Sequence, residues 1–178
     1  MPPYDRARIQ GYLKKADRAR KKAVRGKAYE ELACYLFSCV PGVIVTGRNL
    51  LNTFATEEID VCCTNQQDPT GLPWLNPFIL VECKGWRHLV TSEQVGWFLM
   101  KIEHRGLDFG VLLAAKGITG VPEHLTAAHS LVASALGRKI RMVIITRAEI
   151  EALASGEEFA QLIIEKVTRL HATGGRCY

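Results

Sequence analysis

The chain has 178 residues, of which 48% are hydrophobic, 23% charged and 8% aromatic. This length and apolar content predict one globular domain with a single core, and they exclude a disordered or fibrous chain. No stretch approaches the roughly 18 apolar residues of a membrane helix, and the charged N-terminus lacks a signal-peptide core, so we expect a cytoplasmic protein without membrane contact.

Helices and strands are expected in a definite order along the chain. The expected elements are a helix over 17–40, strands over 43–52, 57–64 and 78–84, a helix over 92–104, a strand over 109–115, a helix over 123–136, a strand over 140–145 and a helical tail after Thr146. Three successive strands predict antiparallel pairing, whereas strands separated by helices predict parallel pairing. We therefore expect an α/β fold with a mixed central sheet flanked by helices.

The formal net charge of +5 is unevenly distributed. Residues 1–27 contain ten Lys and Arg against Asp5 and Asp17, whereas the rest of the chain contains 13 basic and 16 acidic residues. Such a block is either a solvated helix face or an arm that contacts a polyanion, because phosphate contacts release counterions. We assign residues 1–25 to a basic N-terminal helix or arm and residues 26–178 to a single domain.

Charged residues interrupt two of the expected strands. Glu82 and Lys84 are two residues apart at the end of the third strand, so their side chains project from the same face. Asp60 stands between β-branched residues of the second strand, and neighbouring strands would bring the two carboxylates together. Two hard oxygen ligands suit Mg²⁺ or Mn²⁺, and Lys84 could orient an attacking water or stabilise developing charge. The alternative is an ordinary buried ion-pair network.

At these residues the chain resembles the PD-(D/E)xK nuclease superfamily, and within it Mrr-type restriction endonucleases and archaeal Holliday-junction resolvases. The matching strings are Gly26-Lys27-Ala28-Tyr29-Glu30, Glu58-Ile59-Asp60-Val61 and Val81-Glu82-Cys83-Lys84-Gly85. The resemblance covers roughly residues 26–136 and implies a restriction-endonuclease-like αβββαβ core. It implies Asp60, Glu82 and the backbone carbonyl of Cys83 as metal ligands, with Lys84 as the water-handling residue.

The resemblance also implies supporting roles for Glu30 and Gln94. At 100° per residue Glu30 lies at the edge of the apolar stripe of the first helix and Glu31 lies opposite, so only Glu30 can face the sheet. Gln94 corresponds to the glutamine of a Gln-x-x-x-Tyr motif in RecB-type nucleases, although Phe98 replaces the tyrosine. The alternatives are a border carboxylate on an amphipathic helix and a glutamine that bonds the local backbone.

The expected function is Mg²⁺- or Mn²⁺-dependent hydrolysis of DNA by an endonuclease in restriction, repair or recombination. The cations expected to contact the nucleic acid are Lys21, Lys22, Arg25, Lys27 and Lys116. Cutting a duplex takes two active sites, which makes a homodimer plausible. One alternative is a non-catalytic nucleic-acid-binding module that retains the fold. Another is a protein-interaction domain, favoured if the basic arm packs back on its own acidic body.

Overall fold

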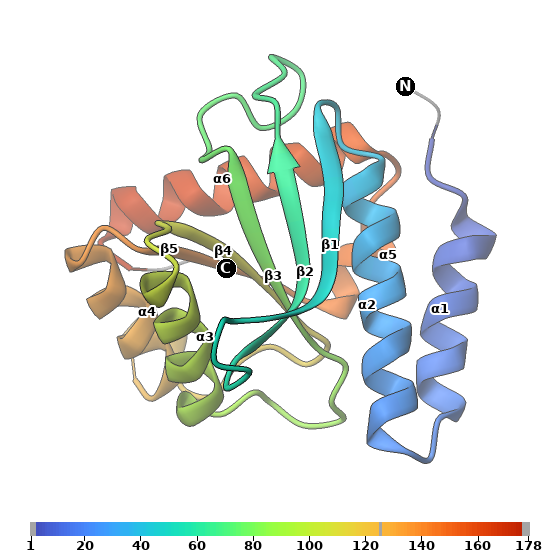
Figure 1. Cartoon of the computed structure of the whole chain (residues 1–178), viewed down its shortest axis with the longest axis horizontal. Coiled ribbons are helices and arrows are strands. Elements are labelled where there is room, and N and C mark those ends of the chain that lie inside the picture. Colours follow the sequence, from blue (N-terminus) through green and yellow to red (C-terminus); the bar gives the residue numbers. More distant parts are fainter. Residues whose placement is uncertain (1–2, 125, 176–178) are drawn as a thin grey trace.

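A five-stranded mixed sheet forms the centre of the molecule. The computed structural model describes residues 3–124 and 126–175. In sequence order across the sheet lie β1 (Val43–Leu51), β2 (Glu58–Asn65), β3 (Phe78–Lys84), β4 (Phe109–Ala114) and β5 (Arg141–Ile145) (Figure 1). The first three strands pair antiparallel, and β3, β4 and β5 pair parallel. The prediction of a mixed α/β sheet is therefore confirmed.

Helices cover both faces of this sheet (Figure 1). One face is covered by α2 (Lys22–Ser38), α5 (Arg147–Ala152) and α6 (Gly156–Thr173), and the other by α3 (Ser92–His104) and α4 (Ala128–Gly137). Strand side chains alternate, so Ile79, Val81 and Cys83 of β3 pack toward α2 while Leu80 packs toward α3. Within the described ranges, no helix combines the length and apolar character needed to cross a bilayer.

The basic N-terminal segment is folded onto the domain. Instead of one helix from residue 17, α1 (Arg6–Arg18) is followed by Ala19 in an extended conformation, and α2 begins at Lys22. The buried residues Ile9, Leu13 and Ala16 recur at helical spacing and place α1 against α2. The segment therefore buries an apolar stripe and leaves most of its charges outside.

The later elements differ from the expected ones in two places. A short 3₁₀ turn, η1 (Pro122–His124), stands where the helix over 123–136 was expected to begin, and α4 starts at Ala128. The helical tail is divided into two helices. Thr146 caps α5 in a reciprocal capping box with Glu149, and Ser155 starts α6 by accepting a hydrogen bond from the Glu158 amide.

Candidate functional site

Asp60 and Glu82 lie where β2 and β3 part. The ladder between these strands ends with Val61 opposite Val81, so Asp60 and Glu82 are the next residue on each strand. Side chains at opposed positions of an antiparallel pair share a face. Beyond this point β3 stays paired with β4 as far as Lys84, which lies opposite Ala114. The carboxylates therefore come together at the open end of one ladder.

The Asp60 carboxylate closes the end of the ladder. Its Oδ2 accepts a hydrogen bond from the backbone N–H of Cys83 at 2.6 Å, and among the described residues no donor reaches its Oδ1. Because the N–H and C=O of one strand residue point toward the same neighbour, the Cys83 carbonyl borders the same space. Burial, and then the negative charge of Glu82, raise the pKa of Asp60 to about 7. Burial beside a second carboxylate therefore disfavours the charged form of Asp60.

Glu82 is buried, and each of its oxygens accepts a hydrogen bond from a lysine. Lys84 Nζ lies 2.7 Å from Oε1, and Lys101 Nζ of α3 lies 2.9 Å from Oε2. A buried carboxylate requires such partners, because an unpaired charge is costly away from water. Lys101 was not predicted to belong to the site. The available signal was its position seven residues after Gln94, which places both on one side of a helix.

Lys84 is held as an ammonium ion. Burial alone would lower its pKa, but the charge of Glu82, the hydrogen bond to Glu82 and the charge of Asp60 together raise the pKa of Lys84 above its usual value. Its Nζ also lies 5.5 Å from the ring centre of Trp86, and Lys22 Nζ lies 4.5 Å from the same ring. Lys84 is therefore a hydrogen-bond donor at neutral pH rather than a base.

Glu30 faces the sheet, as its place on the helix indicated. Its Oε2 lies 3.8 Å from a guanidinium nitrogen of Arg48 on β1, whereas Glu31 points away and pairs with Lys15 of α1 at 2.7 Å. After burial and the charge of Glu82, the charge of Glu30 also contributes to the raised pKa of Asp60. Glu30 is thus an outer member of the cluster. Gln94 is half-buried on α3, and in the described part of the chain it forms no hydrogen bond to the two central carboxylates or to Lys84.

A close contact fixes α2 against the end of β3. A Cβ atom on Gly85 would lie 2.3 Å from the ring of Tyr29, so only glycine lets the ring approach the backbone directly after Lys84. This contact joins two of the sequence strings on which the resemblance was based.

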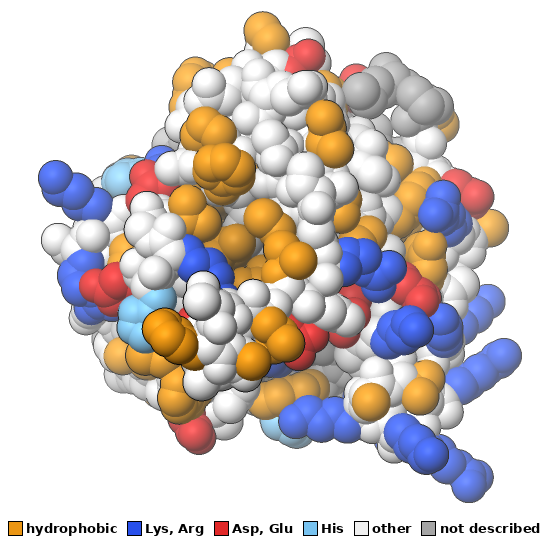
Figure 2. Space-filling model, in the orientation of Figure 1, with side chains coloured by type: hydrophobic (Ala, Val, Ile, Leu, Met, Phe, Trp, Pro, Cys, Tyr) orange, Lys and Arg blue, Asp and Glu red, His pale blue; other side chains and the backbone are white. Residues whose placement is uncertain are grey.

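The cations expected to bind nucleic acid are divided between two places. Lys21, Lys22 and Lys27 are exposed at the start of α2, and Lys and Arg side chains gather over the α1 and α2 side of the molecule (Figure 2). Arg25 and Lys116, 91 positions apart, line one cavity of about 310 Å³. The fold therefore brings together two of the five predicted cations.

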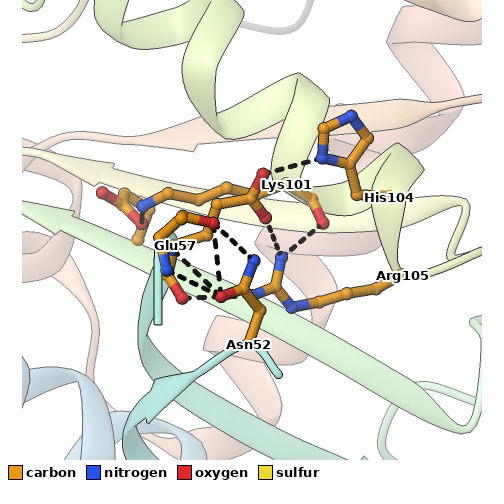
Figure 3. A network of polar contacts seen from close by, with 7 residues as sticks. Asn52, Glu57, Lys101, His104 and Arg105 are labelled. Carbon is orange, nitrogen blue, oxygen red and sulfur yellow. Dashed lines mark hydrogen bonds and ion pairs between the residues drawn. The ribbon is translucent and has the colours of Figure 1, made fainter. Parts of the chain in front are cut away.

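A polar network outside the predicted site supports it. Glu57 accepts hydrogen bonds from His104 at 2.7 Å and from Arg105 at 2.8 Å, and the Asn52 side chain accepts one from the Glu57 amide at 3.3 Å (Figure 3). The bonds from His104 and Arg105 lower the pKa of Glu57. Glu57 precedes Asp60 by three residues, and His104 follows Lys101 by three. The network therefore ties the turn before Asp60 to the end of the helix that carries Lys101.

The donor atoms at this site are of the kind that a small hard cation prefers. Asp60, Glu82 and the Cys83 carbonyl are oxygen donors. Mg²⁺ typically takes few protein ligands, and water and phosphate oxygens fill its remaining coordination positions. Both oxygens of Glu82 are engaged by lysines, so an entering cation must compete with ammonium groups. Among residues 3–124 and 126–175, no group of three or more His, Cys, Asp or Glu side chains is arranged to hold a metal ion.

Comparisons of the chain with protein-family models, with curated proteins and with solved structures find no match. The function is therefore inferred from the residues of the site and their geometry.

Proposed function

We propose that the protein is a nuclease that hydrolyses DNA phosphodiester bonds with the help of Mg²⁺ or Mn²⁺. The observation that carries this proposal is the meeting of Asp60 and Glu82 at the end of the β2–β3 ladder, with Lys84 bound to Glu82. The order α2, β1, β2, β3, α3, β4 supports it, because it is the αβββαβ order expected from the resemblance to PD-(D/E)xK nucleases.

Asp60, Glu82 and the Cys83 carbonyl would hold the cation. When bound, such an ion polarises the phosphodiester and lowers the pKa of a coordinated water. In the net reaction water adds to phosphorus and one P–O bond breaks, which gives a phosphate monoester and an alcohol. Lys84, held as an ammonium ion, would donate to the water oxygen or to a phosphoryl oxygen as negative charge develops. Lys101 would position Glu82.

The DNA would lie along the basic side of the molecule. Exposed Lys21, Lys22 and Lys27 begin α2, and Lys22 contacts the Trp86 ring that also borders Lys84. These cations would bind phosphates without reading sequence, because such contacts are electrostatic. Cleavage of both strands would require a second copy of the chain, and we propose a homodimer for that case.

One observation favours a second candidate, a nucleic-acid-binding module that does not cut. Lys84 and Lys101 together neutralise Glu82, and a chain that never releases either lysine would not admit a cation. Such a protein would bind DNA in EDTA, would gain no affinity from Mg²⁺ and would leave the DNA intact.

The two candidates are separated by a cleavage assay. Purified protein is incubated with supercoiled, linear, single-stranded and branched DNA in Mg²⁺, Mn²⁺ or EDTA. Asp60→Asn and Lys84→Met are compared with Asp68→Asn, a control in the loop after β2, where the half-buried side chain accepts hydrogen bonds, among the described residues, only from Thr70. We expect metal-dependent cleavage that falls about 100-fold or more in the first two variants and stays unchanged in the control, with DNA binding retained. Equal cleavage by all four proteins would reveal a contaminant and overturn the proposal.

A further inference from the structure

A cavity of about 310 Å³ opens directly beyond the candidate site. The loop that follows Lys84 forms one wall, and the other walls come from α1, α2, the end of β4 and the start of α5. Four cationic side chains line it, Arg25, Arg87, Lys116 and Arg147, against the single carboxylate of Asp17. Segments distant in the sequence therefore converge on a pocket with excess positive charge.

Most of that positive charge is not neutralised. Arg147 pairs with Asp17 through two contacts of 2.6 and 3.0 Å, so this carboxylate is already used. Arg87 donates to the backbone carbonyl of Asp17 at 3.0 Å and Arg25 to that of Ala19 at 3.4 Å. These carbonyls orient the two guanidinium groups without cancelling their charge. The charge of Lys116 helps to lower the pKa of Asp17, but in the described part of the chain Lys116 forms no ion pair within 4 Å.

Arg25 carries a further indication of a ligand. Its Nε is buried, and within the described residues no hydrogen-bond acceptor reaches it. A buried donor without an acceptor is destabilising, so native structures usually satisfy it with protein, water or a bound group. An anion with several oxygens would supply the missing acceptor and would also meet the charges of Arg87 and Lys116.

We propose that this cavity binds a phosphate group of the nucleic-acid strand whose neighbouring phosphodiester lies at the active site. Guanidinium groups match phosphate oxygens in bidentate geometry, and a cavity of this size admits a phosphate but not a duplex. The wall formed by Gly85 to Arg87 starts one residue after Lys84, so both positions lie within reach of one strand. This inference rests on the proposed nuclease function and adds to it a second phosphate site.

Either of two sources can present this phosphate. It is a terminal monoester when a strand end enters the cavity, and an internal diester when the strand runs past it. The recognising chemistry is the same, and the oligonucleotides used in the test distinguish the sources.

The experiment measures binding in EDTA, where no cleavage occurs. Arg87→Gln and Lys116→Gln are compared with Arg138→Gln, which removes the same charge beside α4 on the other face of the sheet. Fluorescence anisotropy follows single-stranded oligonucleotides that carry a 5′-phosphate, a 3′-phosphate or hydroxyl groups at both ends. In parallel, NMR follows the Arg25 Nε–H signal during titration with inorganic phosphate.

We expect each cavity variant to weaken binding about tenfold and the Arg138 control to match the wild type. If the variants lose affinity for only one of the phosphorylated oligonucleotides, the cavity binds a terminal phosphate. If they lose affinity equally for all three oligonucleotides, the cavity binds an internal phosphate. The Arg25 signal should shift with phosphate. Cavity variants that bind like the control, together with an unmoved Arg25 signal, overturn the proposal. If the cavity variants bind oligonucleotides more weakly but the wild type cleaves no DNA in the cleavage assay, the proposed nuclease activity is overturned and the phosphate site is not.

Discussion

The ammonium group of Lys101 on α3 lies 2.9 Å from the carboxylate of Glu82 on β3, and it is the second lysine to bind that buried carboxylate. Because Lys84 binds the other oxygen, the charge of Glu82 is balanced within the protein. A divalent cation and the lysines therefore compete for the same carboxylate.

Replacement of Lys101 should expose this competition. Lys101→Met keeps most of the side-chain volume but leaves one Glu82 oxygen without a donor, and it should lower the free energy of unfolding by about 1 to 3 kcal/mol. Mg²⁺ should then raise the melting temperature more in the variant than in the wild type, because one competitor is gone. Urea and thermal unfolding measure both effects. Lys14→Met, an exposed change on α1, is the control. A variant as stable as this control would contradict the role of Lys101.

Asp60 should make stability depend on pH. The pKa of Asp60 is about 7 in the folded chain and 3.8 in the unfolded chain. At pH values between these two, the folded state holds a proton that the unfolded state has released. The free energy of unfolding should therefore fall as pH rises from about 4 to 7. Asp60→Asn removes this penalty and should stabilise the metal-free protein by about 1 to 3 kcal/mol at pH 8, with little gain at pH 4. Urea unfolding across this range measures the difference. A gap between variant and wild type that stays constant with pH would contradict the raised pKa.

The contact between Gly85 and Tyr29 should tolerate no side chain. Gly85→Ala places a Cβ atom 2.3 Å from the Tyr29 ring, and we expect a loss of about 1 to 3 kcal/mol in stability. Gly11→Ala is a matched control on α1, where a Cβ atom meets nothing within 4 Å. Since alanine favours the helix interior, this control should gain about 0.5 to 1 kcal/mol. Similar stability in the two variants would show that the ring moves aside.

The Glu57 network should hold the turn before Asp60. The hydrogen bonds from His104 and Arg105 lower the pKa of Glu57, so their stabilisation is present above its usual pKa and is lost as pH falls through the lowered value. Glu57→Gln should accelerate hydrogen exchange at the Asn52 amide, which donates to the Glu57 carbonyl at 2.9 Å. Glu58→Gln changes an exposed neighbouring carboxylate and serves as the control. Unchanged exchange in the Glu57 variant would show that the turn does not depend on this network.

The elements with strong local patterns were predictable from the sequence. The bounds of β3 and α3 agree with those expected, because an apolar run and a helical period mark them clearly. Residues two apart on a strand share a face, so the pairing of Glu82 with Lys84 also followed from the sequence. The break between α1 and α2 was not predictable from the sequence, because residues 19–21 contain neither Gly nor Pro.

Contacts that depend on how helices cross the sheet were not predictable. Lys101 reaches Glu82 across 19 positions and His104 reaches Glu57 across 47, and no local pattern encodes either approach. The charge block suggested Arg25 but not Arg87 or Arg147, because a single arginine in a loop or at a helix start usually faces solvent. Such residues become candidates only when the fold places them in one cavity.

The central claim is that Asp60 and Glu82 bind one divalent cation, and electron paramagnetic resonance of Mn²⁺ tests it most directly. Free Mn²⁺ is measured during titration of the wild type, Asp60→Asn, Glu82→Gln and the loop control Asp68→Asn. We predict one Mn²⁺ per chain in the wild type and the control, with affinity at least about tenfold lower in the other two variants. Mn²⁺ binding that is absent from the wild type, or equal in all four proteins, would contradict the account.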